Sequence, residues 1–221
     1  MEDAKLIGLD LSFASRDALE ILLEDAIGPE VAREIYEKNL NRIEILQLLT
    51  ESTSTPYDIK EEAGKRLSLP VSPAEKPRHT EDEKKHSLLL KLQHLTVGEK
   101  IAIALRGGQD IRTILLKDSN KEVILTVLKN PKITETEVEL IAHSRNIPEE
   151  ALRAIHKNRE WTKNYSICLA LVNNPKTPPG IGITLVTGLR TKDLVLLEKN
   201  KNISEGIRAV AKKVLHARKT H

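Results

Sequence analysis

VNNPKTP, at residues 172–178, follows directly on the apolar run ICLALV at 167–172, and together they form the most informative stretch of the chain. Asparagine tolerates the left-handed backbone conformation that ends a helix, and the following proline cannot continue a helix. The threonine three residues after Asn174 can cap a new helix by accepting a backbone N–H bond. The stretch therefore predicts a tight turn between two short helices.

The same order of residues occurs four times. Each copy follows an apolar helical run, VILTVL, ALRAIH, ICLALV or LVLL, and each has asparagine at its third position. The copies are LKNPKIT (128–134), HKNREWT (156–162), VNNPKTP (172–178) and EKNKNIS (198–204), which place Asn130, Asn158, Asn174 and Asn200 at equivalent turns. We interpret these asparagines as structural turn residues, and the repetition predicts stacked short helices.

The turn after an apolar helix, as in VNNPKTP, resembles the leucine-rich repeat variant group and, more loosely, HEAT-type α-solenoids. The resemblance covers about residues 100–215, and residues from Leu95 to about Leu197 also resemble a group of uncharacterised bacterial helical-repeat proteins. It implies an all-α fold in which short repeats stack as a solenoid with a concave surface for partners. The leucine-rich repeat variant can be preceded by a cysteine-ligated iron–sulfur module, for which a chain with one cysteine lacks the ligands.

The rest of the chain divides at a proline-rich polar stretch. Pro70, Pro73 and Pro77 interrupt any helix within 68–86, which predicts a solvated linker. We expect a small N-terminal helical unit at 1–67 and a helical-repeat domain at 87–221. Helices of the first unit are expected to begin near Ser15 or Asp17, at Gly28-Pro29, near Arg42 and at Thr55-Pro56, and 49–59 gives a faint copy of the repeat turn.

Charge and composition narrow the setting. Residues 1–83 hold 10 Lys and Arg against 19 Asp and Glu, a formal charge of −9, whereas residues 84–221 hold 25 against 13, or +12. Aromatic residues make up 2% of the chain, which favours an aliphatic core of packed helices over strands. The acidic N-terminus has no secretory pattern and no window is apolar enough to cross a bilayer, so we expect a cytoplasmic protein without a transmembrane segment.

No catalytic or metal-binding pattern emerges. The seven histidines have no metal-site spacing, and Arg106-Gly107-Gly108 lacks a phosphate-loop pattern and is expected to be a helix-ending turn. Cys168, the single cysteine, lies in an apolar run and is expected to be a buried small hydrophobic residue. We therefore predict a protein that is not an enzyme and that needs no cofactor.

One cluster combines basic and aromatic side chains. HKNREWTKNYS at 156–166 brings Lys157, Arg159 and Lys163 together with Trp161 and Tyr165. Cations that neutralise phosphates beside rings that stack on bases suit nucleic acid, although a tryptophan that simply packs in a repeat turn explains the same pattern. A basic tail at 209–221 adds Lys212 and Lys213, either as further contacts or as the solvated face of a terminal helix.

The function expected from the sequence is a helical-repeat binding module or scaffold. The most probable partner class is another protein, because the repeats carry no recognisable chemistry. Nucleic-acid binding through the basic C-terminal repeats is the alternative, with Lys157, Arg159, Trp161, Lys163, Tyr165, Lys212 and Lys213 as candidate contacts. The sequence does not specify the partner or the oligomeric state.

Overall fold

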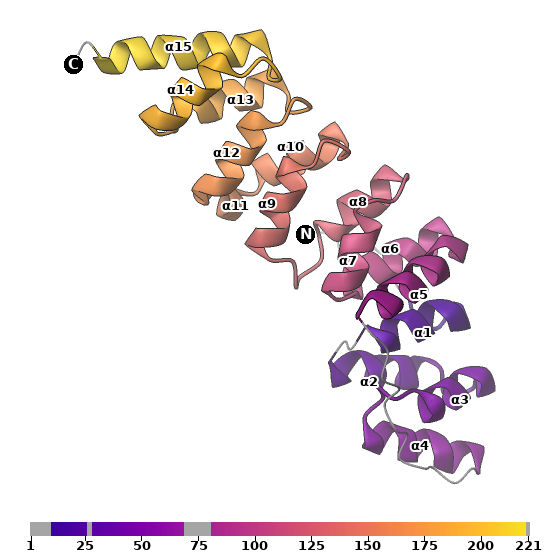
Figure 1. Cartoon of the computed structure of the whole chain (residues 1–221). Coiled ribbons are helices and arrows are strands. Elements are labelled where there is room, and N and C mark those ends of the chain that lie inside the picture. Colours follow the sequence, from indigo (N-terminus) through magenta and orange to yellow (C-terminus); the bar gives the residue numbers. More distant parts are fainter. Residues whose placement is uncertain (1–9, 26–27, 69–80, 220–221) are drawn as a thin grey trace. The chain divides into compact units, whose positions relative to one another are not determined.

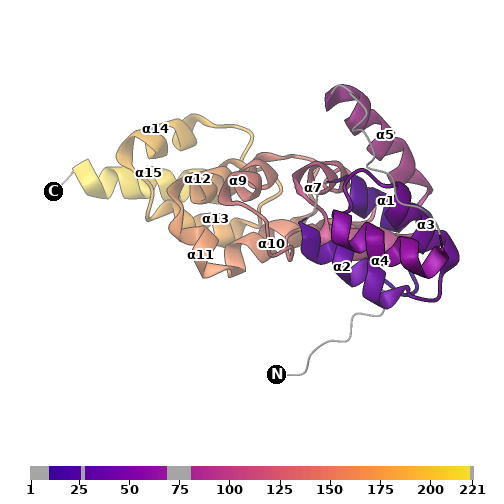
Figure 2. The ribbon, with the colours of Figure 1, turned by 90° about the horizontal axis from the view of Figure 1, so that it is seen from below.

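The computed structural model describes residues 10–25, 28–68 and 81–219, and every regular element within them is an α-helix (Figures 1 and 2). The prediction of an all-α protein is therefore confirmed. The N-terminal helices are α1 (Arg16–Glu24), α2 (Pro29–Lys38), α3 (Ile43–Glu51), α4 (Tyr57–Leu67), α5 (Glu81–His94), α6 (Val97–Arg106), α7 (Gln109–Leu115) and α8 (Lys121–Val127). They are followed by α9 (Glu135–His143), α10 (Glu149–Lys157), α11 (Arg159–Lys163), α12 (Tyr165–Asn173), α13 (Pro179–Val186), α14 (Thr191–Lys199) and α15 (Glu205–Lys219).

The helices form two compact units, Met1–Lys132 and Ile133–His221. Most of the predicted linker, 68–86, lies outside the described residues, so the expected division there stays a prediction. Helix α5 begins at Glu81 and packs in the first unit, where Lys91 forms ion pairs with Glu20 and Glu24 of α1 at 2.9 and 2.6 Å. The described part of α5 thus belongs with the N-terminal helices.

Local sequence signals set many helix starts. Ser15 caps α1 by accepting the Ala18 N–H bond, Pro29 opens α2, and Gly107 ends α6, as predicted. Thr134 forms a capping box with Glu137 at the start of α9, in which each side chain accepts or shares the other's orphan backbone bond. The caps explain why such short helices end and restart without long loops.

Two predicted threonine caps are displaced by one residue. The helices α4 and α13 are preceded by the N-cap residues Pro56 and Pro178, not by Thr55 and Thr177. Both threonines are instead buried, and neither hydroxyl has a hydrogen-bond partner in the described part of the chain. The proline ring sets the entry angle in both turns, and this points the preceding side chain into the core.

The core is aliphatic in both units. In the second unit, Val186, Leu194, Leu197, Ile207 and Leu215 pack together from α13, α14 and α15, each nearly inaccessible to solvent. Gly182 of α13 is buried against Ile207 of α15, so the absence of a side chain lets these two helices approach closely. The scarcity of aromatic residues is therefore met by close helix contacts filled with Leu, Ile, Val and Ala.

A buried carboxylate joins α1 to α7 in the first unit. Asp25 ends α1 and accepts a hydrogen bond from the Gly108 backbone N–H, at the start of α7. A Cβ on Gly108 would lie 2.6 Å from the Asp25 carboxylate oxygen, so only glycine permits this approach. Burial, followed by repulsion from Asp110, raises the pKa of Asp25 to about 6, despite the opposing backbone hydrogen bonds and Arg112.

This raised pKa makes the stability of the first unit depend on pH. The folded state favours protonated Asp25, so the stabilisation is full below the ordinary value of 3.8 and is lost as the pH rises through about 6. Relative to an Asp25→Asn variant, we expect the wild-type chain to gain about 1 kcal/mol when the pH falls from 7.5 to 5, after allowance for solvent screening. Urea unfolding followed by circular dichroism at both pH values measures this difference. Equal pH dependence in the two proteins would contradict it.

Candidate interaction surfaces

The repeated asparagines link successive turns through their side chains. Asn174 is 3% exposed, and its Nδ2 donates to the carbonyl oxygens of Ala142 (2.7 Å) and Ser144 (3.0 Å), at the end of α9. Its Oδ1 accepts the Lys176 N–H at 3.0 Å. One amide group thus satisfies two carbonyls left open by the end of an earlier helix and shapes its own turn.

The same arrangement recurs in the first unit. Asn130 is buried, and its Nδ2 donates to the carbonyls of Ala104 (2.8 Å) and Gly107 (3.0 Å), while its Oδ1 accepts the Lys132 N–H. In the second unit, Asn200 donates to the Oδ1 of Asn173 and accepts the Asn202 N–H. These asparagines are structural joints between neighbouring turns, each reaching back across 23 to 32 residues of sequence.

The backbone reason given for these asparagines is wrong. Asn158, Asn174 and Asn200 have φ angles of −79°, −81° and −76°, in the extended region and not the left-handed one. Asparagine is needed here for its side-chain donors and acceptor, and a residue chosen only for backbone freedom would not replace it. Asn158 differs from the others, because its Oδ1 caps the short helix α11 by accepting the Glu160 N–H.

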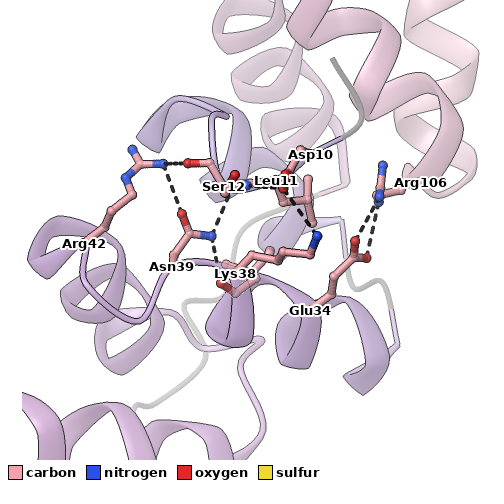
Figure 3. A network of polar contacts seen from close by, with 9 residues as sticks. Asp10, Leu11, Ser12, Glu34, Lys38, Asn39, Arg42 and Arg106 are labelled. Atoms are coloured by element: carbon pink, nitrogen blue, oxygen red, sulfur yellow. Dashed lines mark hydrogen bonds and ion pairs between the residues drawn. The ribbon is translucent and has the colours of Figure 1, made fainter. Parts of the chain in front are cut away.

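Asn39 is a further joint that the sequence analysis missed. It is 1% exposed, and its Nδ2 donates to the carbonyls of Leu11 (3.3 Å) and Ile35 (2.8 Å). Its Oδ1 accepts a bond from Arg42, which also donates to the carbonyls of Ser12 and Ala14 (Figure 3). The signal was present, because the tripeptide Glu-Lys-Asn occurs at both 37–39 and 198–200.

Ion pairs surround this joint. Lys38 lies 3.5 Å from Asp10, and Glu34 accepts two bonds from Arg106, which holds α2 against α6 (Figure 3). These contacts occupy the charged groups of this region with structural work. They leave the network without a free nucleophile or ligand set, and we assign it to the stability of the first unit.

At the C-terminal end, an arginine makes the corresponding contacts. Arg218 of α15 donates to the carbonyls of Leu189 (2.7 Å) and Thr187 (2.9 Å), which follow α13. Positions 130, 174 and 218 are evenly spaced along the chain, so Arg218 occupies the place of a third asparagine. The longer arginine side chain reaches the same kind of target from within a helix.

The basic and aromatic cluster is only partly available for a ligand. Lys157, Arg159 and Lys163 are exposed at α10 and α11, and Trp161 is half-buried beside them. Lys163, however, pairs with both carboxylate oxygens of Glu160 at 2.7 and 2.8 Å. The cations that could meet a phosphate without breaking this pair are therefore Lys157 and Arg159.

Tyr165 is engaged within the protein. Its hydroxyl donates to Asp193 and accepts the Arg190 N–H at 3.0 Å, and the Arg190 guanidinium lies 4.5 Å from the centre of the ring. Burial and the bond to Asp193 raise the pKa of the Tyr165 hydroxyl. The ring thus fastens α12 to the start of α14, and stacking on a base would require it to leave the arginine.

The two predicted lysines of the tail lie on the solvent side of α15. Lys212 and Lys213 are exposed, whereas Ile207, Ala211 and Leu215 bury the opposite face against α13 and α14. Helix α11 packs on α10 and α12. The candidate contacts thus come from two separate groups of helices within the second unit.

Cys168 is half-buried, not fully buried as predicted. Its thiol donates to the Thr162 carbonyl at 3.1 Å, and burial raises its pKa. Both effects favour the protonated thiol over the nucleophilic thiolate. Within the described residues, no group of three or more His, Cys, Asp or Glu side chains is arranged to hold a metal ion.

The most concave apolar surface lies in the first unit, where the turn between α2 and α3 meets the end of α4. It is an open groove of about 450 Å³. Its lining residues are Leu40, Asn41, Ile43, Leu46, Gln47, Arg66 and Leu67, and we call it the Ile43 groove. Ile43 is 62% exposed although it is apolar, and Leu46 is buried beneath it. Arg66 stands at the rim, where its Nε donates to the Tyr36 hydroxyl at 3.1 Å.

Searches of protein-family models, curated proteins and solved structures find no match to this chain. The resemblance to leucine-rich repeat variant and HEAT-type proteins therefore stays a prediction. No helix in the described ranges combines the length and apolar character needed to cross a membrane. The functional argument consequently rests on the surfaces of the molecule itself.

Proposed function

We propose that the chain is a non-enzymatic binding module for a protein partner, and that the Ile43 groove receives an apolar side chain of that partner. The observation that carries the proposal is the exposure of Ile43 over a groove whose floor is already apolar. Binding energy at protein interfaces concentrates where an apolar anchor fills a desolvated pocket surrounded by polar groups. Leu40, Leu46 and Leu67 supply such a pocket, and Asn41, Gln47 and Arg66 supply the polar rim.

The size and setting of the groove agree with this use. A volume of about 450 Å³ holds one or two apolar side chains, and the anchoring of Arg66 on Tyr36 fixes a cation at the rim before binding. Each apolar side chain that moves from water into such a site contributes about 1.5–3 kcal/mol. An affinity in the micromolar range needs only two or three such contacts with good complementarity.

Substitution of Ile43 tests the proposal. An Ile43→Asp variant of the full chain is expected to retain its fold, because position 43 is exposed at the first turn of α3, where an acidic residue suits the helix dipole. We expect it to bind a partner captured by the immobilised wild-type chain at least tenfold more weakly, as measured by titration with the purified partner.

A matched control separates this effect from a general loss of apolar surface. Leu140 of α9 is 66% exposed, belongs to the second unit and lies outside the groove. Leu140→Asp should therefore bind the partner as the wild type does. Undiminished binding by Ile43→Asp, or equal loss in both variants, would remove the groove as the binding site.

Nucleic-acid binding is a second candidate function. Residues 133–221 contain 15 Lys and Arg against 9 Asp and Glu, a formal charge of +6, and Lys157 and Arg159 flank the half-buried Trp161. Fluorescence anisotropy of labelled single- and double-stranded DNA and RNA with the full chain tests it. An affinity that does not weaken as salt rises would exclude phosphate contacts.

A further inference from the structure

Helix α14 presents an apolar projection between two cations. Its buried side carries Leu194 and Leu197, and the residues on its opposite side are Lys192, Val195, Leu196 and Lys199. Leu196 is 67% exposed, the highest value for an apolar residue in the second unit outside its termini. We call this side of α14 the Leu196 face.

The Leu196 face is held in place before any contact is made. Tyr165 binds Asp193 in the first turn of α14 and the backbone of Arg190 just before it. At the other end of the helix, Asn200 is hydrogen-bonded to Asn173. A helix fixed at both ends loses little conformational entropy when its exposed side docks, which favours its use as a rigid binding element.

Charge distinguishes the regions that carry the groove and the face. Residues 10–67, which include the Ile43 groove, hold 7 Lys and Arg against 13 Asp and Glu, a formal charge of −6. Residues 133–221, which include the Leu196 face, carry +6. Glu37 and Glu44 are exposed on the two helices that build the groove, although Glu44 already pairs with Arg42. One region is concave, apolar and acidic, and the other is convex, apolar and basic.

We propose that the Ile43 groove of one molecule receives Leu196 of a second copy of this chain. The proposal rests on the groove function above and names the partner. Leu196 fills the groove with Val195 beside it, while Lys192 and Lys199 approach the acidic side chains of α2 and α3. Because two different surfaces meet, the contact is heterologous, so each molecule keeps one groove and one face free for the next.

The expected association is weak and sensitive to salt. An interface centred on one projecting side chain is small, which places it among transient contacts. Attraction between exposed charges is screened over about 10 Å at 0.1 M salt. In sedimentation velocity, the wild-type chain should show a weight-average mass that rises with concentration up to about 200 µM and falls again at about 0.5 M NaCl.

Two variants and their mixture test the geometry. Ile43→Asp destroys the groove and keeps the face, whereas Leu196→Asp destroys the face and keeps the groove. Each variant alone should sediment as a monomer at every concentration. An equimolar mixture should form a one-to-one complex and nothing larger, because one intact groove and one intact face remain. Leu140→Asp, outside both surfaces, should associate as the wild type does.

Several results would overturn the inference. A wild-type chain that stays monomeric to about 200 µM at low salt excludes the contact, as does a mixture that stays monomeric although both variants retain the wild-type circular dichroism. If the wild type is monomeric and another protein binds in a manner sensitive to Ile43→Asp, self-association is wrong and the groove function stands. Binding of Leu196 to anionic lipid vesicles without self-association likewise assigns the face to another surface.

Discussion

Replacing Asn174 by alanine is expected to lower the free energy of unfolding of the unit Ile133–His221 by about 3 kcal/mol. The substitution removes both donors to the Ala142 and Ser144 carbonyls and the acceptor of the Lys176 N–H. Because Asn174 is 3% exposed, water cannot readily replace the lost bonds. Unsatisfied buried carbonyls are more costly than the mean value of a hydrogen bond suggests.

The measurement has a built-in reporter. Trp161 is the single tryptophan of the chain and lies in this unit, so its fluorescence follows the unfolding of Ile133–His221 in urea. Asn174→Asp should be at least as destabilising as Asn174→Ala, because aspartate keeps the acceptor but turns a carboxylate toward two carbonyl oxygens. Asn202→Ala, at an exposed turn position, should change stability by less than about 0.5 kcal/mol. Similar stabilities for the Asn174 variants and the wild type would refute the role assigned to the joint.

Two glycines of the same helix are expected to respond in opposite directions to alanine. A Cβ at Gly182 would overlap the Cδ1 of Ile207 and lie 2.8 Å from its Cγ1. Overpacking of this kind costs about 1–3 kcal/mol, more than the gain in helix propensity. A Cβ at Gly180 meets nothing within 4 Å, so Gly180→Ala should stabilise the unit by about 0.5–1 kcal/mol.

A double-mutant cycle assigns the cause. Ile207→Val removes the methyl group that would collide with the new Cβ, and it should cost about 1 kcal/mol in the wild-type chain. In the Gly182→Ala background the same change should be neutral or stabilising. Additive effects of the two substitutions would show that Gly182 and Ile207 are not coupled and that α13 adjusts to the alanine.

The sequence predicted the helices better than the contacts between them. Apolar runs, Ser15, Gly28-Pro29 and Gly107 are local signals, and the structure places helix ends at or beside them. The short helix α11 was not predicted, because REWTK is too short for a periodic pattern and its cap, Asn158, had been assigned to a turn. Cap positions at Thr55 and Thr177 were displaced by one residue because proline itself can occupy the N-cap.

The candidate surfaces needed information that no local pattern contains. Whether Tyr165 is free or bound depends on Asp193 and Arg190, which lie more than 20 residues away in sequence. The Ile43 groove combines residues of α3 with the end of α4, and its apolar lining looks in sequence like ordinary core positions. Exposure of Ile43 and Leu196 is a tertiary property, because helical periodicity alone does not say which apolar residues remain uncovered.

The asparagine joints also determine how the molecule yields to mechanical load. Asn174 ties its turn to the turn after α9, and Asn130 ties its turn to the one after α6, so each clamp spans only one interval of the chain. Tension applied along the chain is then carried by one clamp at a time, and the rupture of a clamp releases a segment of about two or three helices while its neighbours hold. Elasticity of this stepwise kind would let the chain lengthen under force in discrete increments and recover each one separately.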